Sequence, residues 1–393
     1  MPIIYSMLLS VSLISLIGVI LKKTINNRVI SNNVTNRYEY VYDGKSISLF
    51  MAILTFSVLV FFVGVRSFYG DTSMYITEYN NYTPIDYNEI KESLSNPDIK
   101  GKLFLLIRCL IKRIFGDDYV PYFFILAFFQ YGAIIKLFYK YSCNYFMTTF
   151  LFMASGYFTW SMNGIRQFTA ICLILYFFEY IVEKKTLKFF IVVLIAVFIH
   201  STALIWIPIY IVVNFKPWGK GIFFFIVAII ILLFSLERAF EILDITLENT
   251  TYNGYGEKIL NAKTNGLDDG VSFIRVVIAA VPLLLSFFVR KNMEDAPRYI
   301  NIFVNLSLIT TCVYFVGVFT SGILVGRLPA YFSIFSYLLI PWLIKYKYGK
   351  NFSMLITIAC YFFYFLYFYY DMVINGTGYY CSEILNVFYW ERI

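Results

Sequence analysis

The chain has 393 residues, of which 60% are hydrophobic, 14% are charged and one is a histidine; its mean hydropathy is +0.71 and its formal net charge is +8. Apolar runs of about 20 residues recur along the whole length, and this is the length that a helix needs to cross a bilayer. The runs are too long and too uniformly apolar for barrel strands, which alternate over about ten residues. The composition therefore predicts an all-α polytopic integral membrane protein.

Cysteine usage and charge narrow the class further. The six cysteines are scattered and show no CxxC spacing, so we interpret them as packing residues. With one histidine and no cysteine cluster, no metal site is expected. The first apolar run, 2–21, lacks a basic region and a small-residue cleavage site, which indicates a retained helix and not a signal peptide. The surplus positive charge lies in short connections between apolar runs, so it sets topology and does not support a nucleic-acid partner.

The first half of the chain is expected to hold five membrane helices, at about 3–21, 46–65, 119–135, 145–160 and 165–182. Lysines and arginines follow the first, third and fifth of them, and such clusters mark cytoplasmic connections. The segment 66–118 is then external. Within it, Lys102–Gly116 carries cations at nearly helical spacing, and we expect this stretch to lie flat in the outer interface.

The apolar run 187–215 contains His200 and could form one tilted helix or two short helices that meet at this residue. One helix would place eight cations of short loops outside, against the positive-inside rule: Lys216, Lys220, Arg290, Lys291, Arg298, Lys345, Lys347 and Lys350. A hairpin keeps all eight inside, so we predict the hairpin. Its first arm, 187–199, reaches about 20 Å, short of the roughly 30 Å hydrocarbon core, and an externally open cavity is expected around His200.

Five further helices are expected at about 221–236, 273–289, 299–320, 328–344 and 351–370. With the hairpin counted as two, the chain has about 11–12 membrane segments in a single transmembrane domain, 1–393. Both termini are then external. The external loops 66–118 and 237–272 are expected to contain interfacial helices.

This topology gathers five basic side chains at or just below the outer membrane surface: Arg66, Arg166, His200, Arg275 and Arg327. Guanidinium groups bind phosphate through two parallel hydrogen bonds. The helix that starts at 165 adds backbone donors and a positive dipole end beside Arg166, with Asn163 as its expected N-cap. The cluster suits a diphosphate held at the membrane surface. The alternative for each arginine is contact with lipid headgroups, and for His200 a structural hydrogen bond in the kink.

Four motifs, VGVRSFYGDTSMY, NGIRQFTA, FIHSTALIWIP and GRLPAYF, follow one another along the chain, and the resemblance that they carry spans about Arg66 to Pro341. In order and spacing they resemble the EpsG-like family of bacterial polysaccharide polymerases, which are related in role to Wzy O-antigen polymerases. The motif positions of that family fall on Arg66, Asp71, Asn163, Arg166, Gln167, His200, Ser201 and Arg327.

The resemblance implies an exopolysaccharide polymerase, a glycosyltransferase of the bacterial cell envelope that joins repeat units carried on undecaprenyl diphosphate. The multi-pass protein would lie in the cytoplasmic membrane with its active site facing outward. Its substrate would be a lipid-linked oligosaccharide. Membrane lipids surround it, and a chain-length regulator and a flippase are candidate partners. No soluble cofactor is expected, because the donor is already activated.

The implied reaction needs residues for two roles: binding of the departing diphosphate and removal of the proton from the acceptor hydroxyl. The arginines, with Asn163 and Gln167, are the expected ligands of the departing diphosphate, and Arg166 is also an expected catalytic residue. His200, whose ordinary pKa lies near 6.5, is the first candidate for the base, and Asp71 is the second.

The sequence also leaves open a different class of protein. A transporter or flippase for the same lipid-linked oligosaccharide would bind it in the basic cavity without cleaving it. Such a protein often carries internal repeats, and the sequence has no visible repeat. A membrane acyltransferase would be expected to carry more than one conspicuous histidine or a His–Asp pair.

Overall fold

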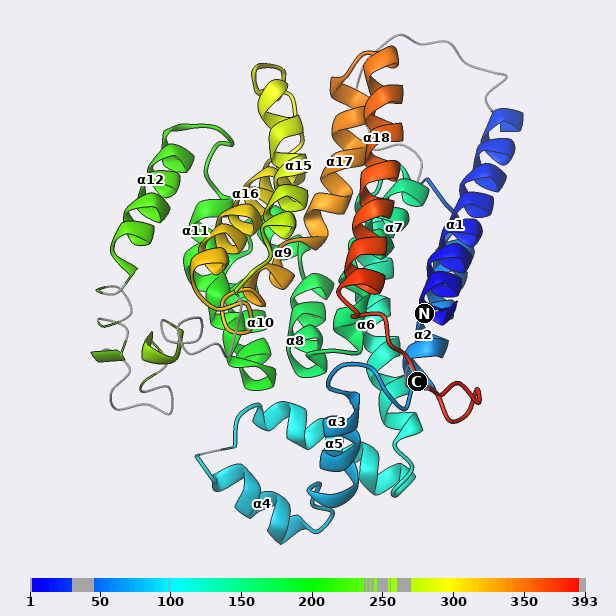
Figure 1. The fold of residues 1–393 in the computed structure, drawn as a ribbon, viewed down its shortest axis with the longest axis vertical. Coiled ribbons are helices and arrows are strands. Elements are labelled where there is room, and N and C mark those ends of the chain that lie inside the picture. Colours follow the sequence, from blue (N-terminus) through cyan, green and yellow to red (C-terminus); the bar gives the residue numbers. More distant parts are fainter. Residues whose placement is uncertain are drawn as a thin grey trace.

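The computed structural model describes residues 2–29, 46–97, 99–236, 238, 241, 244–245, 254, 256–259 and 270–388. Within these ranges the chain is built of helices, and two isolated β-bridges join extended residues. Long helices run side by side along the vertical axis of Figure 1, and the short helices α3 to α5 lie together below them. The all-α class predicted from composition is confirmed.

The helices have the following bounds. The first half of the chain forms α1 (Pro2–Val29), α2 (Leu49–Gly64), α3 (Thr72–Asn81), α4 (Tyr87–Ser95), α5 (Lys102–Phe115), α6 (Val120–Tyr141), α7 (Tyr145–Ala154), η1 (Tyr157–Ser161), α8 (Ile165–Tyr176) and α9 (Glu179–Val182). The second half forms α10 (Thr186–Ile199), η2 (Ser201–Ile205), α11 (Trp206–Val213), α12 (Lys220–Phe234), α15 (Phe273–Phe288), η3 (Arg290–Asn292), α16 (Arg298–Phe319), η4 (Leu328–Tyr331), α17 (Ile334–Lys347), α18 (Lys350–Tyr369) and η5 (Tyr370–Ile374).

Among the described residues, four helical segments are long and apolar enough to cross a bilayer: Ile3–Lys23, Val120–Tyr141, Arg298–Phe319 and Lys350–Ile374. Seven shorter apolar helices of 10–17 residues accompany them. Together with α17, whose apolar residues are buried along most of its length, these helices correspond to the expected membrane segments. The polytopic architecture thus follows the apolar runs of the sequence.

The hairpin predicted around His200 is present. α10 ends at Ile199, and His200 has extended backbone with φ −151° and ψ 121°. The hydroxyls of Thr186, at the start of α10, and Tyr210, near the end of α11, lie 2.6 Å apart. The rings of Phe189 and Tyr210 stack with centroids 5.4 Å apart. The two arms therefore run antiparallel, and His200 lies at the turn.

The two ends of the helix bundle differ in what they carry. Figure 1 places the α11–α12, α15–α16 and α17–α18 connections at its upper end, and helices α3 to α5 with both chain termini in its lower half. The rings of Tyr5 and Phe368 lie 5.5 Å apart, so the start of α1 and the end of α18 are neighbours. The termini thus share the end opposite the connections that hold the eight lysines and arginines, as expected.

Three expected helices are interrupted. The helix expected at 145–160 breaks after Ala154, because Gly156 adopts a left-handed φ of +73° that ends the α-helical ladder. The helix expected at 165–182 divides into α8 and α9, where the N–H of Phe177 bonds back only three residues to Ile174. The helix expected at 328–344 starts as η4, and its α-helical part begins at Ile334. Periodicity alone does not detect such short breaks in apolar sequence.

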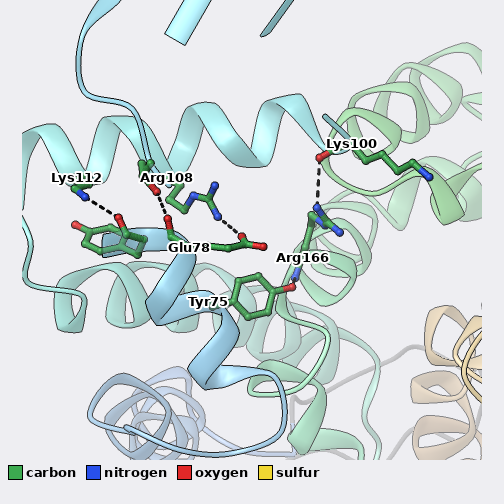
Figure 2. Close-up of polar contacts among 8 residues, drawn as sticks. Tyr75, Glu78, Lys100, Arg108, Lys112 and Arg166 are labelled. Atoms are coloured by element: carbon green, nitrogen blue, oxygen red, sulfur yellow. Dashed lines mark hydrogen bonds and ion pairs between the residues drawn. The ribbon is translucent and has the colours of Figure 1, made fainter. Parts of the chain in front are cut away.

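Helix α5 forms as expected, but two of its four cations, Arg108 and Lys112, make contacts within the protein (Figure 2). Arg108 is buried and pairs with Glu78 of α3. Lys112 is also buried, and its Nζ donates to the carbonyl oxygen of Tyr79 at 2.8 Å. The outer face of α5 exposes Leu106, Leu110 and Ile114, which is an apolar stripe suited to a membrane surface. Most of the other expected external loop, 237–272, lies outside the described residues.

Candidate functional site

A polar cavity of about 470 Å³ lies where four loop segments meet the ends of the membrane helices. The segments are 68–70 after α2, 155–163 between α7 and α8, 322–327 after α16, and 371–379 after α18. Side chains of α15, α16, α17 and α18 complete the wall. Eight aromatic residues line it: Phe68, Tyr69, Tyr157, Trp160, Tyr314, Tyr337, Tyr367 and Tyr379. Aromatic walls with a few placed polar groups are typical of ligand sites.

The C-terminal segment forms part of the cavity wall and is attached to the loop that follows α2. Phe68 and Cys381 form an antiparallel β-bridge, and the hydroxyl of Tyr380 donates to the carbonyl oxygen of Phe62 at 2.7 Å. Within this loop Gly70 has φ +48°, and an added Cβ would lie 2.8 Å from the side chain of Asn163. Only glycine allows this approach of the two segments.

The cavity wall carries an ion pair. Arg275 is on the first turn of α15, and its Nη2 lies 3.3 Å from Oδ1 of Asp371, which is in η5 at the end of α18. The carboxylate side chain is 9% exposed and the guanidinium side chain is 41% exposed. The acid is therefore held in the wall, and the arginine extends into the open space.

Arg327 is the second cation of the cavity. It follows the turn 321–326 and lines the wall beside η4. Nε2 of Gln167, which is buried on α8, donates to the backbone carbonyl oxygen of Arg327 at 3.1 Å and fixes the position of its main chain. Within the described chain, no hydrogen bond or ion pair engages its guanidinium group. Its donors are available to a ligand, and the predicted roles of Arg327 and Gln167 fit their places.

The expectation that Asn163 caps the helix at 165 is wrong. The residue at the N-cap is Gly164, with φ +74°, and no side-chain capping bond forms there. Oδ2 of Asp71 instead accepts a hydrogen bond from the N–H of Gly164 at 3.1 Å. The left-handed turn at Gly164 directs Asn163 toward the cavity, where it lines the wall.

Arg166 lies beside the cavity and does not line it. Figure 2 shows its side chain between Lys100 and Tyr75, where Nη1 donates to the carbonyl oxygen of Lys100 at 3.3 Å. Its backbone N–H donates to the hydroxyl of Tyr75 at 3.3 Å. Burial raises the pKa of the Tyr75 phenol, so this hydroxyl stays protonated. Gly101, at the start of α5, leaves the room that the Arg166 side chain occupies.

Arg66 is enclosed in the protein and does not reach the cavity. The residue is 1% exposed; its guanidinium carbon lies 3.9 Å from the centroid of the Phe123 ring, and its Nε donates to the hydroxyl of Thr72 at 3.0 Å. Another bond joins its Nη1 to the carbonyl oxygen of Val63. Burial lowers its pKa to about 10, so it remains charged at neutral pH. These contacts indicate that Arg66 braces the loop that carries Phe68 and Gly70.

His200 lies in the break of the hairpin, outside the cavity wall. Its Nδ1 is 2.7 Å from the hydroxyl of Thr202, which is 3.1 Å from that of Tyr331. A Cβ built on Gly101 would lie 2.7 Å from the carbonyl oxygen of Ile199 and 2.9 Å from Cδ of Arg166, so the break of the hairpin lies next to Arg166. The hydrogen-bonded chain from His200 to Tyr331 is the structural role that the sequence left open for the histidine.

The predicted residues thus fall into three groups. Asn163, Arg275 and Arg327 line the cavity; Arg166, His200 and Ser201 lie beside it; and Arg66, Asp71 and Gln167 hold the surrounding loops. Sequence reasoning missed Asp371 and the tyrosines of the wall. The signal for Asp371 was an acid at the end of the last apolar run, since an ionisable residue in such a place is a functional candidate as much as an arginine is.

These features define a polytopic helical membrane protein with a polar, aromatic cavity at one end of its bundle. The sequence matches the model of the EpsG family over residues 49–383, which is most of the chain. The chain therefore belongs to the EpsG family, and this membership indicates a polysaccharide polymerase with glycosyltransferase-like chemistry. Comparisons with curated proteins and with solved structures gave no match.

Proposed function

We propose that this protein polymerises oligosaccharide repeat units carried on undecaprenyl diphosphate, by glycosyl transfer at the outer face of the cytoplasmic membrane. The observation that carries the proposal is the cavity, in which Arg275 and Arg327 meet an aromatic and hydroxyl-rich wall. Cations suit a diphosphate, and aromatic rings with hydroxyl groups suit sugar rings. The cavity therefore contains groups that complement both the diphosphate and the sugar rings of a lipid-linked saccharide.

The chemistry asks chiefly for stabilisation of negative charge. When the bond between the anomeric carbon and the diphosphate oxygen breaks, charge develops on the leaving group. In many enzymes, preorganised hydrogen-bond donors at such a position supply most of the rate enhancement. The guanidinium group of Arg327 can donate two parallel hydrogen bonds to the oxygens of the diphosphate. The guanidinium group of Arg275, at the start of α15, can do the same. Arg166 adds positive charge from beside the cavity.

The distribution of cations supports an outward-facing cavity. The upper connections of Figure 1 hold the eight lysines and arginines of short loops, and such connections remain in the cytoplasm. The cavity lies among the loops of the opposite end, with the α2–α3 and C-terminal segments. A lipid carrier displayed on the outer leaflet would present its diphosphate at this level.

Topology is tested with single cysteines on a cysteine-free background. Both Lys216, in the α11–α12 connection, and Glu89, on α4, are exposed. In intact cells a membrane-impermeant maleimide is expected to label Glu89→Cys and to leave Lys216→Cys unlabelled until the membrane is permeabilised. Labelling of Lys216→Cys in intact cells would place the cavity in the cytoplasm.

The function itself is tested by reconstitution. The full-length protein in liposomes is supplied with lipid-linked repeat units extracted from cells that lack it, and products are separated by size. We expect a ladder of lengthened, lipid-linked saccharides, and protein-free liposomes should give none. A protein that moves the lipid-linked saccharide between leaflets without lengthening it would be a flippase, and the proposal would be wrong.

A further inference from the structure

Asp371 is the one acidic residue among the described residues that line the cavity. It lies in the π-helical turn Tyr370–Ile374, which directly follows α18. Wide turns of this kind are frequent at functional sites, because they redirect a side chain that a regular helix would place elsewhere. The turn directs the acid to the cavity wall and not to lipid.

Three contacts fix the position of Asp371. Its Oδ1 pairs with Nη2 of Arg275 at 3.3 Å. The backbone carbonyl oxygen of Asp371 accepts a hydrogen bond from the hydroxyl of Thr377 at 2.6 Å, which anchors the turn. On the third side Gly156 packs closely, since a Cβ built there would lie 3.1 Å from Oδ2. Within the described chain, Arg275 is the side chain that bonds the carboxylate. Oδ2 is therefore open to a hydrogen bond from a ligand in the cavity.

The other candidate bases are placed less well. Oδ2 of Asp71 is bonded to the N–H of Gly164, and this residue does not line the cavity. His200 does not line it either, and its Nδ1 is bonded to Thr202. A general base must lie within hydrogen-bond reach of the proton that it takes. Among these three groups, Asp371 is the one that a ligand in the cavity can touch.

We propose that the cavity binds the saccharide of the acceptor repeat unit and that Asp371 is the base that takes the proton from its attacking hydroxyl. This inference rests on the proposed function and deepens it. It makes Asp371 a catalytic residue, with Arg275 as the residue that positions the carboxylate.

The step balances within the two substrates and the protein. The acceptor oxygen forms a bond to the anomeric carbon of the donor saccharide. The bond from that carbon to the diphosphate oxygen breaks, and its electron pair leaves on the diphosphate beside Arg327. The hydroxyl proton moves to the carboxylate of Asp371 and later passes to water. No oxidant, reductant or further co-reactant takes part.

The test compares Asp371→Asn, which keeps the shape of the side chain, with His200→Gln and Glu383→Gln in the reconstituted ladder assay. Glu383 is an exposed acid of the same C-terminal segment and serves as the matched control. We expect Asp371→Asn to slow lengthening by about 10²–10⁴-fold, the usual scale for a general base, while binding of the lipid-linked donor changes by less than about threefold. Glu383→Gln and His200→Gln should stay within about fivefold of the wild type, and Asp371→Glu should recover part of the loss.

A second comparison guards against misfolding, because Asp371→Asn leaves the charge of Arg275 without its partner. The rate of lengthening per mole of folded protein is compared between Arg275→Gln and the double variant Arg275→Gln with Asp371→Asn. The difference between these two rates measures the effect of the carboxylate alone. A large further loss in the double variant supports the proposal. The proposal would be refuted if Asp371→Asn lengthened the saccharide at a rate within threefold of the wild type. It would also be refuted if Arg275→Gln and the double variant lengthened it at equal rates. Loss in His200→Gln with retention in Asp371→Asn would return the base to His200. These outcomes are distinct from failure of the function, which would appear as a missing ladder in the wild type.

Discussion

Arg327→Lys is expected to lower polymer formation by about 100-fold or more while the protein accumulates normally. Lysine keeps the charge but lacks the planar fork that binds two oxygens of a phosphate at once. The guanidinium of Arg327 has no ion-pair partner in the described chain, so its loss leaves no buried acid unpaired and removes no structural bond. The effect then falls on the transition state, where loss of one preorganised donor costs about 10²–10³-fold.

The matched control for this change is Arg290→Lys, at the opposite end of the bundle. Arg290 is exposed, and its guanidinium packs on the ring of Phe287 at 3.9 Å and donates to the carbonyl oxygen of that residue. It carries the same substitution without access to the cavity, so polymer should stay within about twofold of the wild type. The ladder assay, run with a thermal-stability measurement of each purified variant, gives the comparison. Wild-type ladders from Arg327→Lys would mean that the cavity does not bind the diphosphate.

Much of the fold could be predicted from the sequence, because length and charge act on whole segments. Apolar runs indicated the membrane helices, and the positive-inside rule decided between one helix and a hairpin at His200. The contact between Thr186 and Tyr210 confirmed the hairpin. Breaks such as the one at Gly156 were not predicted, because glycine is common in membrane helices. Its left-handed backbone packs against η5, where an added Cβ would lie 3.0 Å from Cε of Met372.

The site was predicted only in part. A sequence shows that a residue lies at the end of a helix, but it does not show toward which neighbouring segment the side chain points. Arg66 and Arg327 occupy equivalent positions in sequence, next to the end of an apolar helix. Arg66 nevertheless turns inward onto Phe123, whereas Arg327 lines the cavity. Asp371 was not predicted as a site residue, because its partner Arg275 is 96 residues away in the chain. Pairing across the bundle depends on which helices become neighbours, and periodicity carries no such information.

Gly156→Ala is expected to lower polymer formation by about tenfold beyond any loss of folded protein. An added Cβ would lie 3.0 Å from Cε of Met372 and 3.1 Å from Oδ2 of Asp371. The carboxylate must then move by a few tenths of an ångström, and catalytic groups misplaced by 1 Å lose about 100-fold. The backbone also contributes, because alanine in a left-handed conformation costs about 1–2 kcal/mol.

Gly254→Ala separates the two effects. Gly254 has the same φ of +73°, but in the described part of the chain a Cβ there would have no neighbour within 4 Å. Both variants therefore carry the backbone strain, and Gly156→Ala alone presses on the cavity wall. Ladder formation per mole of folded protein should fall in Gly156→Ala and remain near the wild-type rate in Gly254→Ala. Equal activity of the two would show that the position of the Asp371 carboxylate does not limit the reaction, since the steric contact at Gly156 is what distinguishes them.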